Sequence, residues 1–190
     1  MTVAVSPFKD LFGVRDDGLT EWTEPLTDIE YDAAIRYGVK LWRRSQELGF
    51  ADKVSDPEKS RRMQELQMLT ELAVAKYLGL AWNHEGFSFK NADLAHNIEV
   101  RTIGVEYYAL RVYPNDRDHM RVVGVVCPKG KERDPYALPG WIGATEARNI
   151  GILIDPNGRG QPFYAIPQKS LRPMRELREI IRQENLEFEL

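Results

Sequence analysis

The order of the periodic segments is the feature that most constrains how this chain can fold. Two segments with apolar residues at helical spacing, 27–48 and 56–78, come first. Short segments rich in β-branched and aromatic residues follow between about residues 87 and 166, and a last helix is predicted over about 173–183. This order predicts one α/β domain in which a single mixed sheet is flanked by helices.

The predicted helices have recognisable ends. Thr27 and Glu30 form a capping-box pattern at the start of the first helix, and Gly49 suits the left-handed conformation after its end. Pro57 lies in the first turn of the second helix, which should stop at Gly79. The remaining predicted elements are strands at 87–89, 98–103, 107–113, 121–127, 151–154 and 162–166, and a brief helix near 145–148.

The length of 190 residues predicts one domain, which we place at 27–183 between an irregular arm, 1–26, and an acidic tail, 184–190. The single cysteine, Cys127, excludes an intramolecular disulfide and is expected to be a buried thiol. The net charge of −3 argues against bulk binding of nucleic acid, although a local basic face is compatible with it.

No apolar run approaches the roughly 20 residues that a membrane-spanning helix needs, and the first residues do not resemble a secretory signal. We therefore expect no membrane partner and a cytoplasmic location.

Three carboxylates lie on or near apolar elements. Glu71 projects from the apolar side of the second helix, where an ionised group needs a compensating partner. Glu99 and Arg101 share one face of a predicted strand, with Val100 on the other, and Asp93 lies six residues before Glu99. Two such carboxylates and a backbone carbonyl make half of an octahedral Mg²⁺ or Mn²⁺ shell, whereas Glu71 taken alone favours a helix-flank glutamate paired with a surface arginine.

The order of these residues resembles that of the PD-(D/E)xK nuclease superfamily. The resemblance is closest to small uncharacterised phage and prophage proteins with that fold, and it covers about residues 27–175. The segments that carry it are Thr70–Leu80, Ala92–Leu94, Glu99–Thr102, Pro139–Gly143, Phe163–Pro167 and Leu171–Pro173.

The resemblance implies a restriction-endonuclease-like fold and a DNA-binding, metal-dependent hydrolase, that is, a phage-type nuclease that cleaves phosphodiester bonds with a metal-activated water. Asp93, Glu99 and the carbonyl of Val100 would bind magnesium or manganese. Glu71 would orient water or bind a second ion, and Arg101 would hold the scissile phosphate. A phage-encoded protein of this kind would act in the host cytoplasm.

The chain departs from the superfamily pattern at Arg101, which stands where the usual residue is lysine. Arginine stays protonated and cannot act as a general base. Lys90 could reach the site from its own loop as a weak substitute. The alternative function is therefore a catalytically degenerate nuclease-fold protein that binds nucleic acid or a protein partner without cleavage, and a structural phage component is a third.

Several basic residues are candidate phosphate contacts, although most such runs are solvated faces. They are Lys90, Arg111, Lys169, Arg172 and Arg175. A homodimer could join such residues into a basic groove. The segment 114–119, which contains Asp116 and Asp118, is predicted to be a hairpin turn between two strands.

Overall fold

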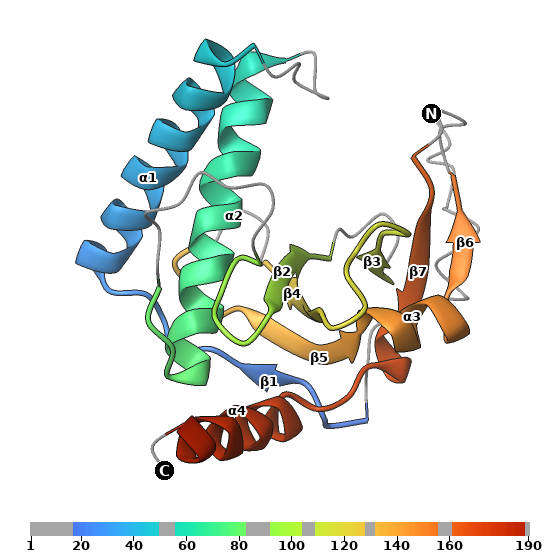
Figure 1. Cartoon of the computed structure of the whole chain (residues 1–190). Helices are drawn as coiled ribbons and strands as arrows, with labels where there is room; N and C mark the ends of the chain where they lie inside the picture. Colours follow the sequence, from blue (N-terminus) through green and yellow to red (C-terminus); the bar gives the residue numbers. More distant parts are fainter. Residues whose placement is uncertain are drawn as a thin grey trace.

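The computed structural model describes residues 17–49, 56–82, 92–103, 109–127, 132–155 and 161–188. Four α-helices and seven strands lie in these ranges (Figure 1). In chain order they are β1 (Glu21–Trp22), α1 (Asp28–Glu47), α2 (Pro57–Leu78), β2 (Ile98–Thr102), β3 (Ala109–Val112), β4 (Arg121–Val126), β5 (Ala137–Gly143), α3 (Ala144–Ile150), β6 (Ile152–Ile154), β7 (Phe163–Pro167), the 3₁₀ turn η1 (Gln168–Ser170) and α4 (Met174–Phe188).

The strands form two sheets rather than one. The first has the order β1-β5-β4-β2; its β2–β4 pair is parallel and its other pairs are antiparallel. The second has the order β3-β7-β6 and is antiparallel throughout. The mixed α/β fold is thus confirmed, whereas the expectation of a single sheet is wrong, because β3 pairs with β7 far along the chain instead of with its neighbour β4.

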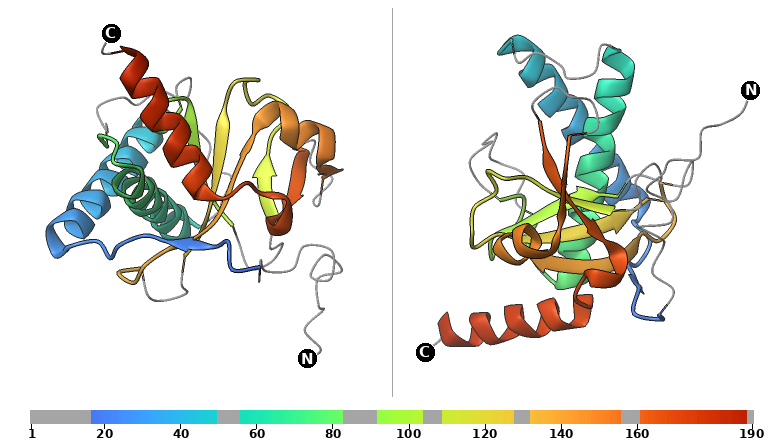
Figure 2. Two further views of the ribbon diagram at one scale, coloured as in Figure 1. Left: turned by 90° about the horizontal axis from the view of Figure 1, so that it is seen from below. Right: turned by 90° about the vertical axis from the view of Figure 1, so that its right-hand side faces the viewer.

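Two hydrophobic cores separate three layers. One core joins α1, α2 and α4 to the first sheet through side chains such as Leu69, Val100 and Leu177. The other lies between the opposite face of that sheet and the second sheet with α3, and contains Val122 and Ile166. Figure 2 shows α1, α2 and α4 on one side of the first sheet and β6, β7 and α3 on the other.

The predicted helix starts are confirmed in detail. The Thr27 side chain accepts from the backbone N–H of Glu30, whose carboxylate accepts in return from the backbone N–H of Thr27. The Asp56 carboxylate caps α2, and Gly79 ends that helix with a φ of 70°. Local hydrogen-bonding chemistry fixes these ends, which is why the sequence alone located them.

Three other expectations differ from the structure. Residues 114–119 do form a turn, but the strands on either side of it belong to different sheets, so the hairpin is wrong. Helix α4 extends to Phe188 and takes in most of the predicted acidic tail. The predicted irregular N-terminal arm contributes β1, which pairs with β5. The sequence did not predict β5 as a strand, because this segment contains one proline and two glycines.

Cys127 is half-buried against the helical core, and burial raises the pKa of its thiol to about 11. Within the ranges that the structure describes, no helix combines the length and apolar composition needed to cross a bilayer.

Helices α1 and α2 approach each other most closely at Gly38. A Cβ atom added there would lie 2.7 Å from the Cα of Glu65, whose backbone cannot rotate away. The α1–α2 pair in turn holds the buried face of α2 against the sheet.

We expect Gly38→Ala to lower the free energy of unfolding by about 1–3 kcal/mol, because the added methyl group forces the helices apart. Urea denaturation of the purified variant measures this loss. The control is Arg36→Ala, an exposed change on the same helix, which should stay within about 0.5 kcal/mol of the wild type. Equal stability of the two variants would show that the helices can separate at no cost.

Candidate functional site

Among the strands that the structure describes, β2 lies at the edge of its sheet, and half of its backbone groups face away from its partner β4. The carbonyl of Asn97 accepts from the N–H of Arg121, and the N–H of Ile103 donates to the carbonyl of Val125. Because successive residues of a strand direct their N–H and C=O groups to alternate sides, the odd-numbered residues bond to β4. The N–H and C=O of Val100 therefore point to the side of β2 away from β4. In the part of the chain that the structure describes no further strand lies there, and we call this side the open edge of β2.

Asp93 occupies this open edge. Its Oδ2 accepts from the N–H of Val100 at 2.8 Å. A tight turn brings it there: the N–H of Leu94 donates to the carbonyl of Ile98 at 3.0 Å, and residues 96–97 adopt φ values of 58° and 56°. The carboxylate of Asp93 thus lies beside the strand that carries Glu99 and Arg101, as the sequence predicted.

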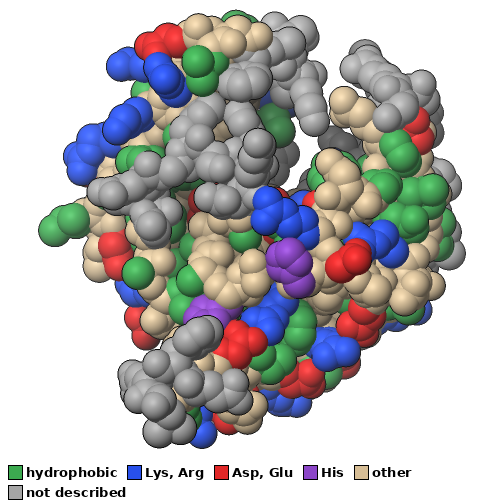
Figure 3. Space-filling model, viewed as in Figure 1, with side chains coloured by type: hydrophobic (Ala, Val, Ile, Leu, Met, Phe, Trp, Pro, Cys, Tyr) green, Lys and Arg blue, Asp and Glu red, His purple; other side chains and the backbone are tan. Residues whose placement is uncertain are grey.

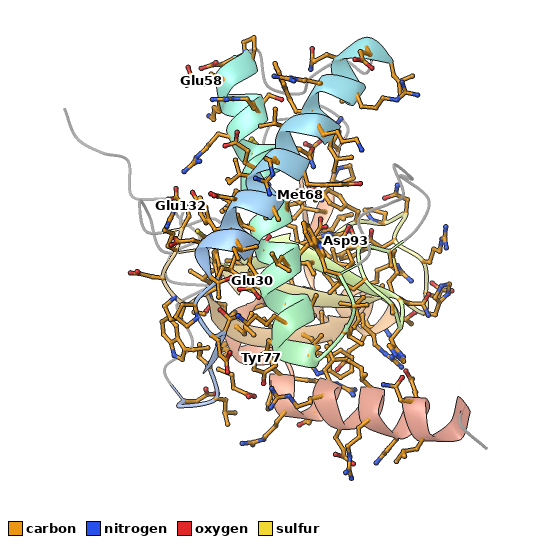
Figure 4. The ribbon with its side chains drawn as sticks, turned by 90° about the vertical axis from the view of Figure 1, so that its left-hand side faces the viewer. Glu30, Glu58, Met68, Tyr77, Asp93 and Glu132 are labelled. Carbon is orange, nitrogen blue, oxygen red and sulfur yellow. The ribbon has the colours of Figure 1, made fainter. Side chains whose placement is uncertain are left out.

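Glu71 reaches the same region from α2. It is only 6% exposed, and its Oε1 accepts from the side-chain amide of Gln67 at 2.8 Å. Burial raises the pKa of Glu71 to about 9, and the negative charges of Asp93 and Glu99 contribute to the rise. Figure 4 shows Asp93 beside the middle turns of α2.

The pKa values of Asp93 and Glu99 are raised as well. Burial and the charge of Glu99 raise the pKa of Asp93 to about 7, against the opposing effects of the Val100 N–H and of Arg101. Burial also raises the pKa of Glu99, although Arg101 lowers it. Glu71, Asp93 and Glu99 therefore form one electrostatic cluster, which we call the acidic cluster.

Arg101 is already engaged. Its Nη1 donates to Asp116 Oδ2 at 2.6 Å and to the carbonyl of Arg111 at 2.8 Å. Its Nη2 donates to Asp116 Oδ1 at 2.7 Å and, at the longer distance of 3.3 Å, to Glu99 Oε1. The guanidinium also lies 4.8 Å from the centre of the Tyr113 ring. Asp116 is thus its principal partner, a contact that the sequence gave no reason to expect.

The acidic cluster carries hard oxygen donors of the kind that Mg²⁺ and Mn²⁺ prefer. Asp93, Glu99 and the edge-facing carbonyl of Val100 could supply three of them. Within the described ranges, however, no group of three or more His, Cys, Asp or Glu side chains is arranged to hold a metal ion. The acidic cluster thus has the donor chemistry for a divalent cation but no ready-made arrangement of three such side chains around one point.

The described members of the predicted phosphate contacts lie in different surroundings. The Arg111 side chain lies over the Phe163 ring, and its backbone carbonyl accepts from the guanidinium of Arg101. Arg172 pairs with Glu146 at 3.1 Å, while Lys169 and Arg175 are exposed near the start of α4. Figure 3 shows both signs of charge interspersed over the sheet end of the face seen in Figure 1. Lys90 lies outside the described residues.

Exposed cations also lie along α1, which contributes none of the predicted phosphate contacts. Arg36, Lys40 and Arg43 follow one another at helical spacing on its outer face, and Figure 3 shows blue side chains gathered over this helix. The spacing of four and three residues was the available signal for this stripe.

A second network joins α4 to the turn after Asp93. Glu184 accepts from Arg121 and contacts Nδ1 of His96 at 2.8 Å, and these two partners lower its pKa to about 2. The sequence gave no signal for this contact, because its members are 25 to 88 residues apart.

No protein-family model, curated protein or solved structure matches this chain. The resemblance to the PD-(D/E)xK superfamily therefore stays a prediction.

The raised pKa of Glu71 gives a testable dependence of stability on pH. The unfolded chain releases this proton near a pKa of about 4.3, whereas the folded protein keeps it to higher pH. The folded state then binds more protons than the unfolded state, so the free energy of unfolding falls as pH rises above about 5. We expect the fall between about pH 5 and pH 8 to exceed that of Glu71→Gln by about 1–3 kcal/mol.

Urea denaturation across this pH range measures the difference. Glu58→Gln is the control, because Glu58 lies on the same helix with 85% of its side chain exposed, and its curve should run parallel to the wild type. Parallel curves for the wild type and Glu71→Gln would show that Glu71 titrates normally.

Proposed function

We propose that this protein is a phosphodiesterase that depends on Mg²⁺ or Mn²⁺ and acts on DNA. The observation that carries the proposal is the acidic cluster at the open edge of β2, in which burial raises the pKa of every carboxylate and repulsion within the cluster adds to the rise for Glu71 and Asp93. Such a cluster destabilises the folded protein when no ligand is bound. A bound divalent cation would remove this cost by neutralising the negative charges.

In this proposal Asp93, Glu99 and the carbonyl of Val100 hold the cation. When bound there, the cation supplies Lewis-acid activation of water and charge neutralisation at the phosphate. Asp93 is well suited to the role because its Oδ2 is anchored by the Val100 N–H, which leaves Oδ1 for a ligand. The same hydrogen bond fixes Asp93 against the edge to which the Val100 carbonyl points.

In this proposal Glu71 takes up and releases a proton as a general acid–base group. Gln67 holds its Oε1, so Oε2 is the atom that takes up or releases the proton. Its raised pKa means that it carries this proton near neutral pH while the other two carboxylates are unliganded. A carboxyl group whose pKa lies near the working pH is suited to general acid–base catalysis.

Arg101 contacts the phosphate only if one of its hydrogen bonds is exchanged. The longest of them, from Nη2 to Glu99 at 3.3 Å, is the one available for exchange. If Glu99 served as a cation ligand, the Nη2 donor that now faces it would be available to a phosphate oxygen. The cationic stripe of Arg36, Lys40 and Arg43 on α1 would then add sequence-independent contacts to the DNA backbone.

A second function, binding of nucleic acid or a protein partner without cleavage, is favoured by the state of Arg101. Both terminal nitrogens of its guanidinium are engaged with protein acceptors, and arginine cannot serve as the general base that lysine provides. A protein of this kind would keep the acidic cluster and the cationic stripe but would not cut.

Millimolar Mn²⁺ should raise the melting temperature, because binding to the folded state alone stabilises it. At a hundredfold excess over Kd the gain is about 2.7 kcal/mol, which corresponds to roughly 5–10 °C for a chain of this size. Asp93→Asn and Glu99→Gln should lose this response while keeping or gaining stability in chelator, since each relieves repulsion. Differential scanning calorimetry measures both effects.

Asp118→Asn is the matched control for this experiment, because Asp118 pairs with Arg148 on the exposed surface and should keep the full response. A wild type without any Mn²⁺-dependent shift, together with destabilised Asp93 and Glu99 variants, would identify these carboxylates as structural.

Cleavage separates the two candidate functions. Labelled single-stranded, duplex and branched DNA should be cut in Mn²⁺ and left intact in chelator, and Asp93→Asn should reduce the rate by about 10³-fold or more. Retarded DNA in a gel-shift assay with no cleavage product in any metal would support the binding function instead.

A further inference from the structure

Asp116 engages Arg101 in a geometry that is set independently of the acidic cluster. The carboxylate and the guanidinium meet through two parallel hydrogen bonds of 2.6 and 2.7 Å, and the side chain of Asp116 is only 9% exposed. Paired bonds of this kind fix the orientation of the guanidinium as well as its position.

The turn that carries Asp116 is itself anchored. Asp116 Oδ2 also accepts from the N–H of Tyr113 at 2.7 Å, and the N–H of Asp116 donates to the carbonyl of Tyr113 at 3.1 Å. Arg148 of α3 donates to the carbonyl of Asp116 at 2.9 Å. The backbone and α3 therefore hold the Asp116 carboxylate in place, and Arg101 comes to it.

The pairing of Arg101 with Asp116 weakens the attraction between the Arg101 guanidinium and the carboxylates of the acidic cluster. Arg101 makes one long contact with Glu99, while its strong contacts go to Asp116 and the carbonyl of Arg111. A guanidinium that is neutralised by its own carboxylate attracts neighbouring anions far less than an unpaired one. Without Asp116, the same guanidinium could form its paired hydrogen bonds with Glu99 or Asp93 and compete with a cation for them.

We propose that Asp116 is a positioning residue that draws Arg101 away from the acidic cluster and so keeps Asp93 and Glu99 available to a divalent cation. The inference rests on the proposed function for its consequence, cation binding, but not for the position of Arg101. Asp116 is not itself a ligand in this scheme, since the carboxylate oxygens are taken by the guanidinium and the Tyr113 N–H.

The test compares Mn²⁺ binding by the wild type, Asp116→Asn, Arg101→Met and the double variant, with the free-ion signal in electron paramagnetic resonance as the readout. Asp116→Asn should bind Mn²⁺ more weakly by about tenfold or more, because Arg101 loses its charged partner and then competes with the cation for Asp93 and Glu99. The double variant, in which the pair is again neutral, should return to within about threefold of the wild type. Asp32→Asn, an exposed aspartate on α1, should bind as the wild type does.

A second measurement follows the guanidinium without metal. In metal-free wild type, the side-chain NMR signals that Arg101→Met removes should show the restricted rotation of a group held by two hydrogen bonds. Asp116→Asn should change these signals, and Asp32→Asn should not. Unchanged Arg101 signals in Asp116→Asn would overturn the inference even in a protein that binds no metal.

The binding outcomes are distinguishable. If Asp116→Asn binds Mn²⁺ as tightly as the wild type does, the inference is overturned and the proposed function is left intact. Loss of binding in Asp116→Asn that the double variant does not restore would make Asp116 a direct ligand or a structural residue, and this also overturns the inference. Absence of Mn²⁺ binding in the wild type overturns the proposed function, and the NMR comparison then decides whether Asp116 positions Arg101.

Discussion

The removal of three carboxylates from water at the open edge of β2 is the constraint on which the rest of this structure depends. An isolated buried carboxylate costs several kcal/mol unless it is protonated, paired or hydrogen-bonded. All three solutions are used: Glu71 has the most raised pKa and accepts from Gln67, Glu99 contacts Arg101, and Asp93 accepts from the Val100 N–H. The apolar burial in the two hydrophobic cores offsets the cost that remains.

The position of the cluster follows from the packing of three elements. Helix α2 packs closely against α1 at Gly38, and its buried face carries Glu71. The tight turn at residues 94–98 folds Asp93 back along the strand edge. An edge strand is needed for this arrangement, because a second neighbour would occupy the Val100 N–H and carbonyl.

Arg101 shows how a residue identified correctly from the sequence can have an unexpected partner. Alternation along β2 placed it beside Glu99, and the structure has the two side chains 3.3 Å apart. Its strongest bonds nevertheless go to Asp116, in a turn that residue types alone suggested was a simple hairpin. The turn leads from one sheet to the other instead, and so brings its aspartate over β2.

The sequence by itself determined the ends of α1 and α2, most strand positions and the alternation that separates Glu99 and Arg101 from Val100, because these depend on capping chemistry and on periodicity within a few residues. It also located the carboxylates that lie together. Only the tertiary structure decided that the strands form two sheets, that α4 continues through the acidic tail to meet Arg121 and His96, and that Asp116 holds Arg101. These features join residues far apart in the chain, and their geometry arises when whole layers pack, which no local pattern records.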